Sequence, residues 1–127
     1  MNQVINRMNL SDDELYTYLY YKEHDNIRVC FVRGAFSTTL DGFFQEISCS
    51  LRFPSYFGWN WDAFDDCMCD LEWLKFTKML IVVDHFGFVF RDEPLKEKQV
   101  KLLSKHLNQI SEFWRQHQIE IAIIFNR

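Results

Sequence analysis

Five acidic residues lie close together between positions 53 and 74 of this 127-residue chain. They are Asp62, Asp65, Asp66, Asp70 and Glu72. No Lys, Arg or His interrupts the segment, so it carries a formal charge of −5, whereas the whole chain carries −4. Carboxylates at this density can act as general acids and bases in catalysis, or they can bind a cationic partner.

The acids are expected to lie on a helix. Pro54 and Gly58 indicate a loop, and Asn60 after them is a favoured N-cap residue. From Trp61 towards Leu71, apolar residues recur with helical spacing and predict an inner face that packs on a sheet. That face comprises Trp61, Phe64, Met68 and Leu71, with Cys67 at its border. On the opposite side every fourth residue is an aspartate, so the acids form a stripe. The stripe comprises Asp62, Asp66 and Asp70, with Asp65 close by.

The energetics of an isolated helix explain only part of this stripe. Asp62 and Asp65 lie in the first turn, where the helix dipole favours an acid by about 0.3–1 kcal/mol. Asp66 and Asp70 have no such explanation, because like charges four residues apart destabilise a helix by about 0.2–0.5 kcal/mol per pair. A solvated helix surface would normally include Lys or Arg. The stripe therefore indicates a partner that supplies the cations.

Aromatic residues flank the acids at Tyr56, Phe57, Trp59 and Trp61. The predicted helix can bury only Trp61 of these. Tyr56 and Trp59 are candidate anchors for a protein partner, because Trp and Tyr are enriched at the positions that dominate binding energy in interfaces. In a domain this rich in aromatic residues, both side chains could equally fold back over the edge of the sheet.

Three short runs rich in β-branched residues indicate strands at 27–32, 79–83 and 119–125. The last two are almost continuously apolar, which favours a parallel sheet covered on both faces. Residues 38–50, with Ser37 as N-cap, and the run opened by Pro94 have helical spacing. Their expected inner positions are Leu40, Phe43, Phe44, Ile47, Val100, Leu103, Leu107, Ile110 and Trp114. The order of elements predicts an α/β fold with right-handed crossovers on a small parallel sheet.

The first 26 residues allow two interpretations. Ser11 and Glu14 form a capping-box pattern that predicts the start of a helix. Residues 15–20 are nevertheless rich in β-formers, and the polar residues after them could turn the chain back as an antiparallel edge strand against 27–32. We prefer the helix.

Composition and charge disfavour several classes of protein. A 48% hydrophobic chain of this length predicts one globular domain, and the acidic balance disfavours nucleic-acid binding. No segment has the pattern of a membrane span or a signal peptide, so we expect a cytoplasmic protein with reduced thiols. Cys67 and Cys69 would point about 200° apart on a helix, and no second ligand pair follows. We therefore predict no metal and no cofactor.

Eight residues of segment 53–67 match one known signature at fixed spacing. They are Pro54, Tyr56, Gly58, Asn60, Asp62, Ala63, Asp66 and Cys67. The segment resembles the signature of the barstar family, whose members are intracellular inhibitors of ribonucleases. The order of elements around it also fits, so the resemblance covers 27–125. It implies a domain at 27–127 and an N-terminal extension, helix or edge strand, at 1–26.

The resemblance implies a three-stranded parallel sheet with helices packed mainly on one side, in two layers. It also implies that the helix starting at Trp61 plugs the active site of the ribonuclease in a 1:1 complex, the free inhibitor being a monomer. Tyr56, Asp62 and Asp66 would face the enzyme, with Asp66 in place of an RNA phosphate. The predicted contact set is Tyr56, Trp59, Asn60, Asp62, Asp65, Asp66, Asp70 and Glu72. Asp65 and Asp70 depart from the best-known member, which has tryptophan and glycine there.

Two other functions compete with this one. A small carboxylate enzyme could use Asp62, Asp66 and His85, although the chain has no glycine-rich phosphate loop and no HExxH or GxSxG motif. A barstar-like module could instead bind another basic protein or a toxin that is not a ribonuclease, as immunity proteins do. The N-terminal extension and the shifted charges favour an immunity protein, of the toxin–antitoxin kind, over an inhibitor of the cell's own secreted enzyme.

Overall fold

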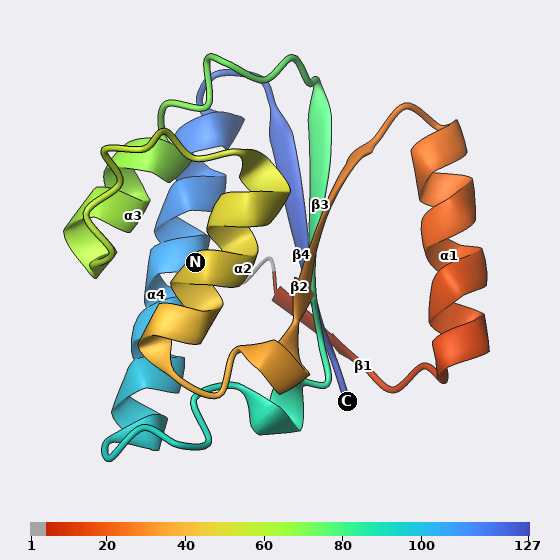
Figure 1. The fold of residues 1–127 in the computed structure, drawn as a ribbon. Helices are drawn as coiled ribbons and strands as arrows, with labels where there is room; N and C mark the ends of the chain where they lie inside the picture. The colour runs from red at the N-terminus through yellow and green to blue at the C-terminus, as the bar shows by residue number, and fades with distance from the viewer. Residues whose placement is uncertain (1–4) are drawn as a thin grey trace.

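An all-parallel sheet forms the centre of the molecule in a computed structural model that describes residues 5–127 (Figure 1). Within those residues the strands are β1 (Ile5–Met8), β2 (Arg28–Arg33), β3 (Lys78–Asp84) and β4 (Glu120–Asn126). The helices are α1 (Asp12–His24), α2 (Leu40–Leu51), α3 (Trp61–Met68) and α4 (Lys96–Arg115). Two short 3₁₀ turns lie at Gly34–Phe36 and Phe86–Phe88. The predicted α/β class and parallel sheet are confirmed.

The strands follow the order β1-β4-β3-β2. Ile81 of β3 is opposite Cys30 of β2 and Ile123 of β4, and all three are buried. This explains the continuous apolar runs, because a central parallel strand is covered on both faces. The prediction of three strands was wrong. The four residues of β1 pair in parallel with β4, and a run this short shows no pattern of its own.

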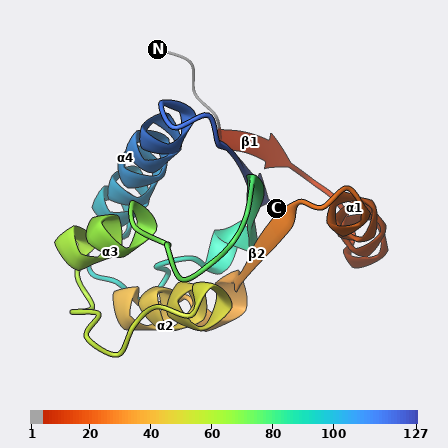
Figure 2. The same ribbon diagram turned by 90° about the horizontal axis from the view of Figure 1, so that it is seen from above.

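Helices cover both faces of the sheet, so the prediction of two layers was also wrong. Figure 2 shows α2, α3 and α4 on one side and α1 alone on the other. The α1 side buries Leu15 against Leu80, Val82 and Ile124, whereas alternate strand residues such as Ile81 face the other three helices. Successive side chains of a strand point to opposite faces of the sheet, so the apolar side chains of β3 are buried only if helices pack on both faces.

The N-terminal segment forms the predicted helix and not an antiparallel strand. The Ser11 hydroxyl accepts a hydrogen bond from the Glu14 amide at 3.2 Å, and the Glu14 carboxylate accepts one from the Ser11 amide at 3.0 Å. This capping box fixes the start of α1. Residues 1–4, also part of the predicted extension, lie outside the described residues.

The helix after β2 begins two residues later than predicted. Thr39, and not Ser37, is the N-cap, since its hydroxyl accepts a hydrogen bond from the Gly42 amide at 3.1 Å. Ser37 is buried, and its hydroxyl donates to the carbonyl of Arg33. The predicted inner positions Phe43 and Ile47 are buried, as are Leu103, Leu107 and Ile110 of α4. No helix among residues 5–127 combines the length and apolar character that a membrane crossing needs.

Candidate functional site

The acidic helix α3 begins where the sequence predicts. The side-chain oxygen of Asn60 accepts a hydrogen bond from the Ala63 amide at 2.8 Å, and its amide nitrogen donates to the Gly58 carbonyl at 3.1 Å. The helix ends at Met68, three residues before the expected Leu71. Leu71 adopts a left-handed backbone with φ of 45°, and its side chain is buried. Leu71 is therefore buried as predicted, but outside the helix.

The inner face of α3 packs into an aromatic core. Phe64 and Met68 are fully buried, and the Phe64 ring lies 5.9 Å from that of Phe43 and 6.1 Å from that of Phe44. Trp61 is only partly buried and packs edge-on against Phe44 at 5.3 Å. Large aromatic side chains bury much area per residue, so a helix this short is held firmly.

Helix α4 holds α3 through polar contacts at three levels. Trp61 Nε1 donates to Gln99 at 3.1 Å, and Trp114 Nε1 donates to the Met68 carbonyl at 2.7 Å. Between them, His106 Nδ1 lies 2.8 Å from the Asp65 carboxylate, where a ring N–H donates. The His106 ring also stacks on Trp61 with an interplanar angle of 2°. The outer face of α3 is thus presented on a rigid support.

That outer face carries carboxylates with no internal partner. Asp62 and Asp66 are exposed, and within residues 5–127 neither carboxylate makes a hydrogen bond or an ion pair. Asp65, on the flank of the same helix, is partly buried and bound to His106. These three of the acids that the sequence analysis grouped together therefore differ in what they can offer a partner.

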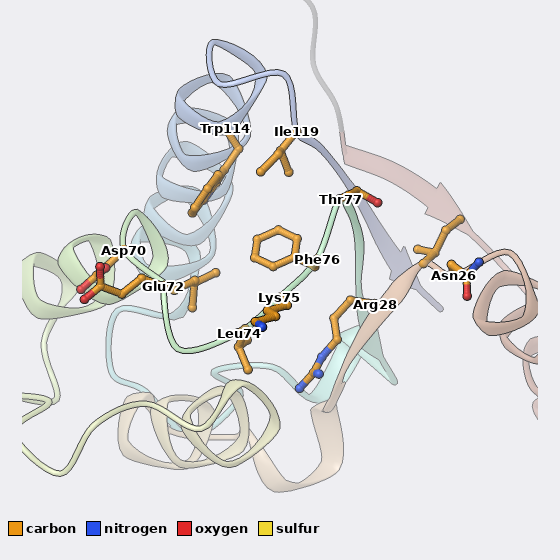
Figure 3. A pocket seen from close by; sticks show the side chains of 12 residues that line it. Asn26, Arg28, Asp70, Glu72, Leu74, Lys75, Phe76, Thr77, Trp114 and Ile119 are labelled. Carbon is orange, nitrogen blue, oxygen red and sulfur yellow. The ribbon is translucent and has the colours of Figure 1, made fainter.

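The stripe does not continue along the helix to Asp70. Because α3 ends at Met68, Asp70 and Glu72 lie in the segment that follows, where both are exposed and line a groove (Figure 3). Trp114, Phe76 and Arg28 line the same groove, although no local pattern marked them as surface residues of interest. They come together there from α4, β2 and the chain before β3.

The negative charge of this segment acts on its two cysteines. Burial, followed by the charges of Asp66 and Asp70, raises the pKa of the Cys67 thiol. Burial, followed by Asp65 and Asp66, raises the pKa of Cys69 to about 11. Both side chains therefore stay as neutral thiols at neutral pH, and the thiolate is the form that attacks electrophiles or binds metals.

The two candidate aromatic anchors occupy the loop before α3. Tyr56 is 76% exposed, so it does not fold back over the sheet. Trp59 is 42% exposed and stacks on the buried Phe57 at 6.0 Å between ring centres. Its backbone is left-handed, with φ of 56°, a conformation that is costly for a bulky residue. Both rings thus lie at the surface, on the loop that leads into α3.

This arrangement agrees with one known family. A protein-family model described as Barstar (barnase inhibitor) matches residues 27–126. The chain belongs to the Barstar family. The match includes the acidic helix and its supporting helix α4, and it begins at the residue before β2. None of the curated proteins matches the chain.

Barstar family inhibitors bind barnase-type ribonucleases and are not enzymes. The geometry gives no support to the alternative of a carboxylate enzyme. His85 lies 3.5 Å from Asp84 and 4.0 Å from Asp12, and within residues 5–127 it forms no ion pair with Asp62 or Asp66. The three groups of that hypothetical site are not brought together.

The group of Asp12, Asp84 and His85 was missed by sequence reasoning. Their ligand atoms lie within 4.8 Å of one another, close enough to hold a metal ion in principle. Arg127 pairs with Asp12 and lies 3.7 Å from Asp84, so a guanidinium already balances both carboxylates. Only the fold brings α1 and the ends of β3 and β4 together, which is why no spacing in the sequence indicated this group.

Proposed function

We propose that this Barstar-family chain blocks the active site of a ribonuclease with the outer face of α3, and that this ribonuclease is a cognate toxin. The single observation that carries the proposal is the state of Asp62 and Asp66. Both are exposed on a firmly held helix, and neither carboxylate has a cationic partner within residues 5–127. Carboxylates of this kind contribute most to binding free energy when a partner supplies the cations that pair with them.

Carboxylates can take the place of RNA phosphates chemically. Both groups are anionic at neutral pH, and both accept paired hydrogen bonds from the fork of an arginine. A ribonuclease active site has to hold phosphate with cationic side chains, so it offers the groups that α3 lacks. We propose that Asp66 takes the central position, with Asp62 beside it. Tyr56 and Trp59 then provide aromatic contact at the edge.

The remaining predicted contacts take different roles in this proposal. Asn60 orders the start of α3 through its cap, and Asp65 orients the helix through His106. Because these groups are already ordered in the free chain, binding should cost little conformational entropy. We propose a 1:1 complex inside the producing cell, with residues 27–127 as the inhibitory unit, to which β1 adds an edge strand and α1 a cover on the opposite face.

The test is inhibition of barnase, and of any ribonuclease encoded by the gene next to that of this chain. Asp66→Ala should weaken inhibition strongly, because removing one partner of a buried charge pair costs about 2–5 kcal/mol of binding free energy. Its melting temperature should not fall, because Asp66 is exposed and without an internal partner. Full inhibition by Asp66→Ala would rule the proposal out.

A charge-matched control separates the effect of losing the α3 carboxylates from the effect of changing the net charge of the chain. The double variant Glu23→Gln/Asp25→Asn removes two exposed acids at the end of α1, on the other face of the sheet. The double variant Asp62→Asn/Asp66→Asn removes the same charge from α3. Only the second should lose inhibition. Association should also slow as salt is added, since steering between opposite charges is screened.

A further inference from the structure

A groove of about 850 Å³ lies directly beyond the C-terminal end of α3 (Figure 3). Residues at or just before the starts of β2, β3 and β4 line it, together with the segment that joins α3 to β3. Asp70 belongs to this lining and follows the last turn of α3. A protein seated on α3 would therefore also reach the groove.

One wall of the groove is aromatic. Trp114 and Phe76 are both partly exposed, with ring centres 5.4 Å apart at 62°. The hydrogen bond from Trp114 Nε1 to the Met68 carbonyl fixes the indole, so the wall is tied to the end of α3. A fixed indole face is a good surface for a flat cation such as guanidinium.

The two rims of the groove carry opposite charge. Asp70 and Glu72 lie at the end nearest α3, Arg28 lies across from them on β2, and Lys75 lies between, on the segment that joins α3 to β3 (Figure 3). Within residues 5–127 no ion pair neutralises either carboxylate. Leu71 between them is buried, which anchors the backbone that carries both acids. A segment bound here thus has one favoured orientation, with its cation towards α3.

We propose that the groove binds an arginine-bearing loop of the ribonuclease. The guanidinium pairs with Asp70 and Glu72, and the arginine chain and neighbouring backbone lie along Trp114 and Phe76. Arginine fits this combination better than lysine, because its planar fork matches carboxylates and stacks on aromatic faces. Arg28 and Lys75 face the carbonyl or carboxylate groups of the same loop. This inference rests on the proposed function, since the same enzyme occupies α3.

The groove can be tested without the ribonuclease, using acetyl-arginine amide as the probe. In a nitrogen-15 NMR titration, it should shift the Trp114 indole signal and the amides of residues 70–76. Acetyl-citrulline amide, a neutral molecule of nearly the same shape, should not. The double variant Asp70→Asn/Glu72→Gln should remove the arginine response, and Lys75→Gln, a charge change on the same segment, should keep it. Equal shifts with citrulline, or an unchanged response in the double variant, would overturn the proposal.

Binding to the ribonuclease provides the second test. Asp70→Asn/Glu72→Gln should lower affinity about tenfold, which corresponds to roughly 1.4 kcal/mol. Its melting temperature should match that of the unchanged chain, because both side chains are exposed. If Asp66→Ala abolishes inhibition while the groove variant binds normally, the proposed function stands and the groove inference fails. If Asp66→Ala inhibits fully, the proposed function itself fails. Groove signals that shift when the chain alone is concentrated would assign the groove to a second copy and overturn the inference.

Discussion

The acids of α3 differ from those at the carboxyl end of the sheet in what they contact. At the sheet, Asp84 is buried, accepts a hydrogen bond from Asn126 at 2.9 Å and lies near Arg127, which also pairs with Asp12. On α3, Asp62 and Asp66 have no such partner within residues 5–127. The sheet acids serve the fold, because they connect α1 to the strands. Asp62 and Asp66 make no contact of this kind inside the described chain, which agrees with the proposal that they act in a complex.

The difference predicts that changes in the two regions separate stability from binding. Asn126 provides the largest expected effect, because its side chain is buried and makes three hydrogen bonds. It accepts from the Leu10 amide at 2.8 Å, donates to the Leu10 carbonyl at 3.1 Å and donates to Asp84. Asn126→Ala should therefore lower the free energy of unfolding by about 3 kcal/mol, measured by urea denaturation. Inhibition at a temperature where the variant is folded should not change, and a specific loss of inhibition would contradict the separation.

A smaller effect, on binding and not on stability, is expected at Trp59 in the loop before α3. Trp59→Ala should weaken ribonuclease binding by about 1–2 kcal/mol, as interface aromatic residues do, and it should leave stability nearly unchanged. Tyr16→Ala is the matched control, since Tyr16 is 74% exposed on α1 behind the sheet. Both affinities can be measured by calorimetry. Equal losses in the two variants would show that exposed aromatic residues in general, and not this loop, govern binding.

Asp65 sharpens the comparison, because it lies on α3 but behaves as a structural acid. Asp65→Asn weakens its bond to His106 and should lower the free energy of unfolding by about 1 kcal/mol, given that the pair is only partly buried. Asp66→Asn should show the reverse pattern, with unchanged stability and lost affinity. Thermal unfolding and inhibition assays on both variants test this. If the two substitutions behave alike, the pairing seen in the structure does not decide function.

The smallest effect is expected at Glu46, another acid that serves the fold. Hydrogen bonds from Arg33 lower the pKa of the Glu46 carboxyl, with contacts of 2.7 and 2.8 Å to the guanidinium. A lowered pKa in the folded state adds stability above the unfolded pKa, and that stability is lost as pH falls through the folded value. Glu46→Gln should therefore be less stable by about 1 kcal/mol or less at neutral pH. The difference in free energy of unfolding between Glu46→Gln and the unchanged chain should disappear below about pH 4. A difference that grew in acid would contradict this pH dependence.

Local features of the fold were predictable, whereas its edges and ends were not. The start of α3 follows from Asn60, which acts within four residues, and the inner face of α4 follows from periodicity. The end of α3 lies where the Trp114 indole donates to the Met68 carbonyl, and the position of β1 depends on the open edge of β4. Both are decided by contacts between distant parts of the chain, which no window of sequence contains.

By itself, the sequence determined that this protein carries a −5 segment beside aromatic residues, and that part of it forms a helix with one apolar face. Only the tertiary structure decided which of those acids are free. His106 contacts Asp65 across 41 residues of sequence, and the early end of α3 moves Asp70 and Glu72 into a groove with Trp114. The reason is physical: composition sets how much charge a segment holds, but the packing of α4 against α3 decides whether each carboxylate finds its partner inside the chain or outside it.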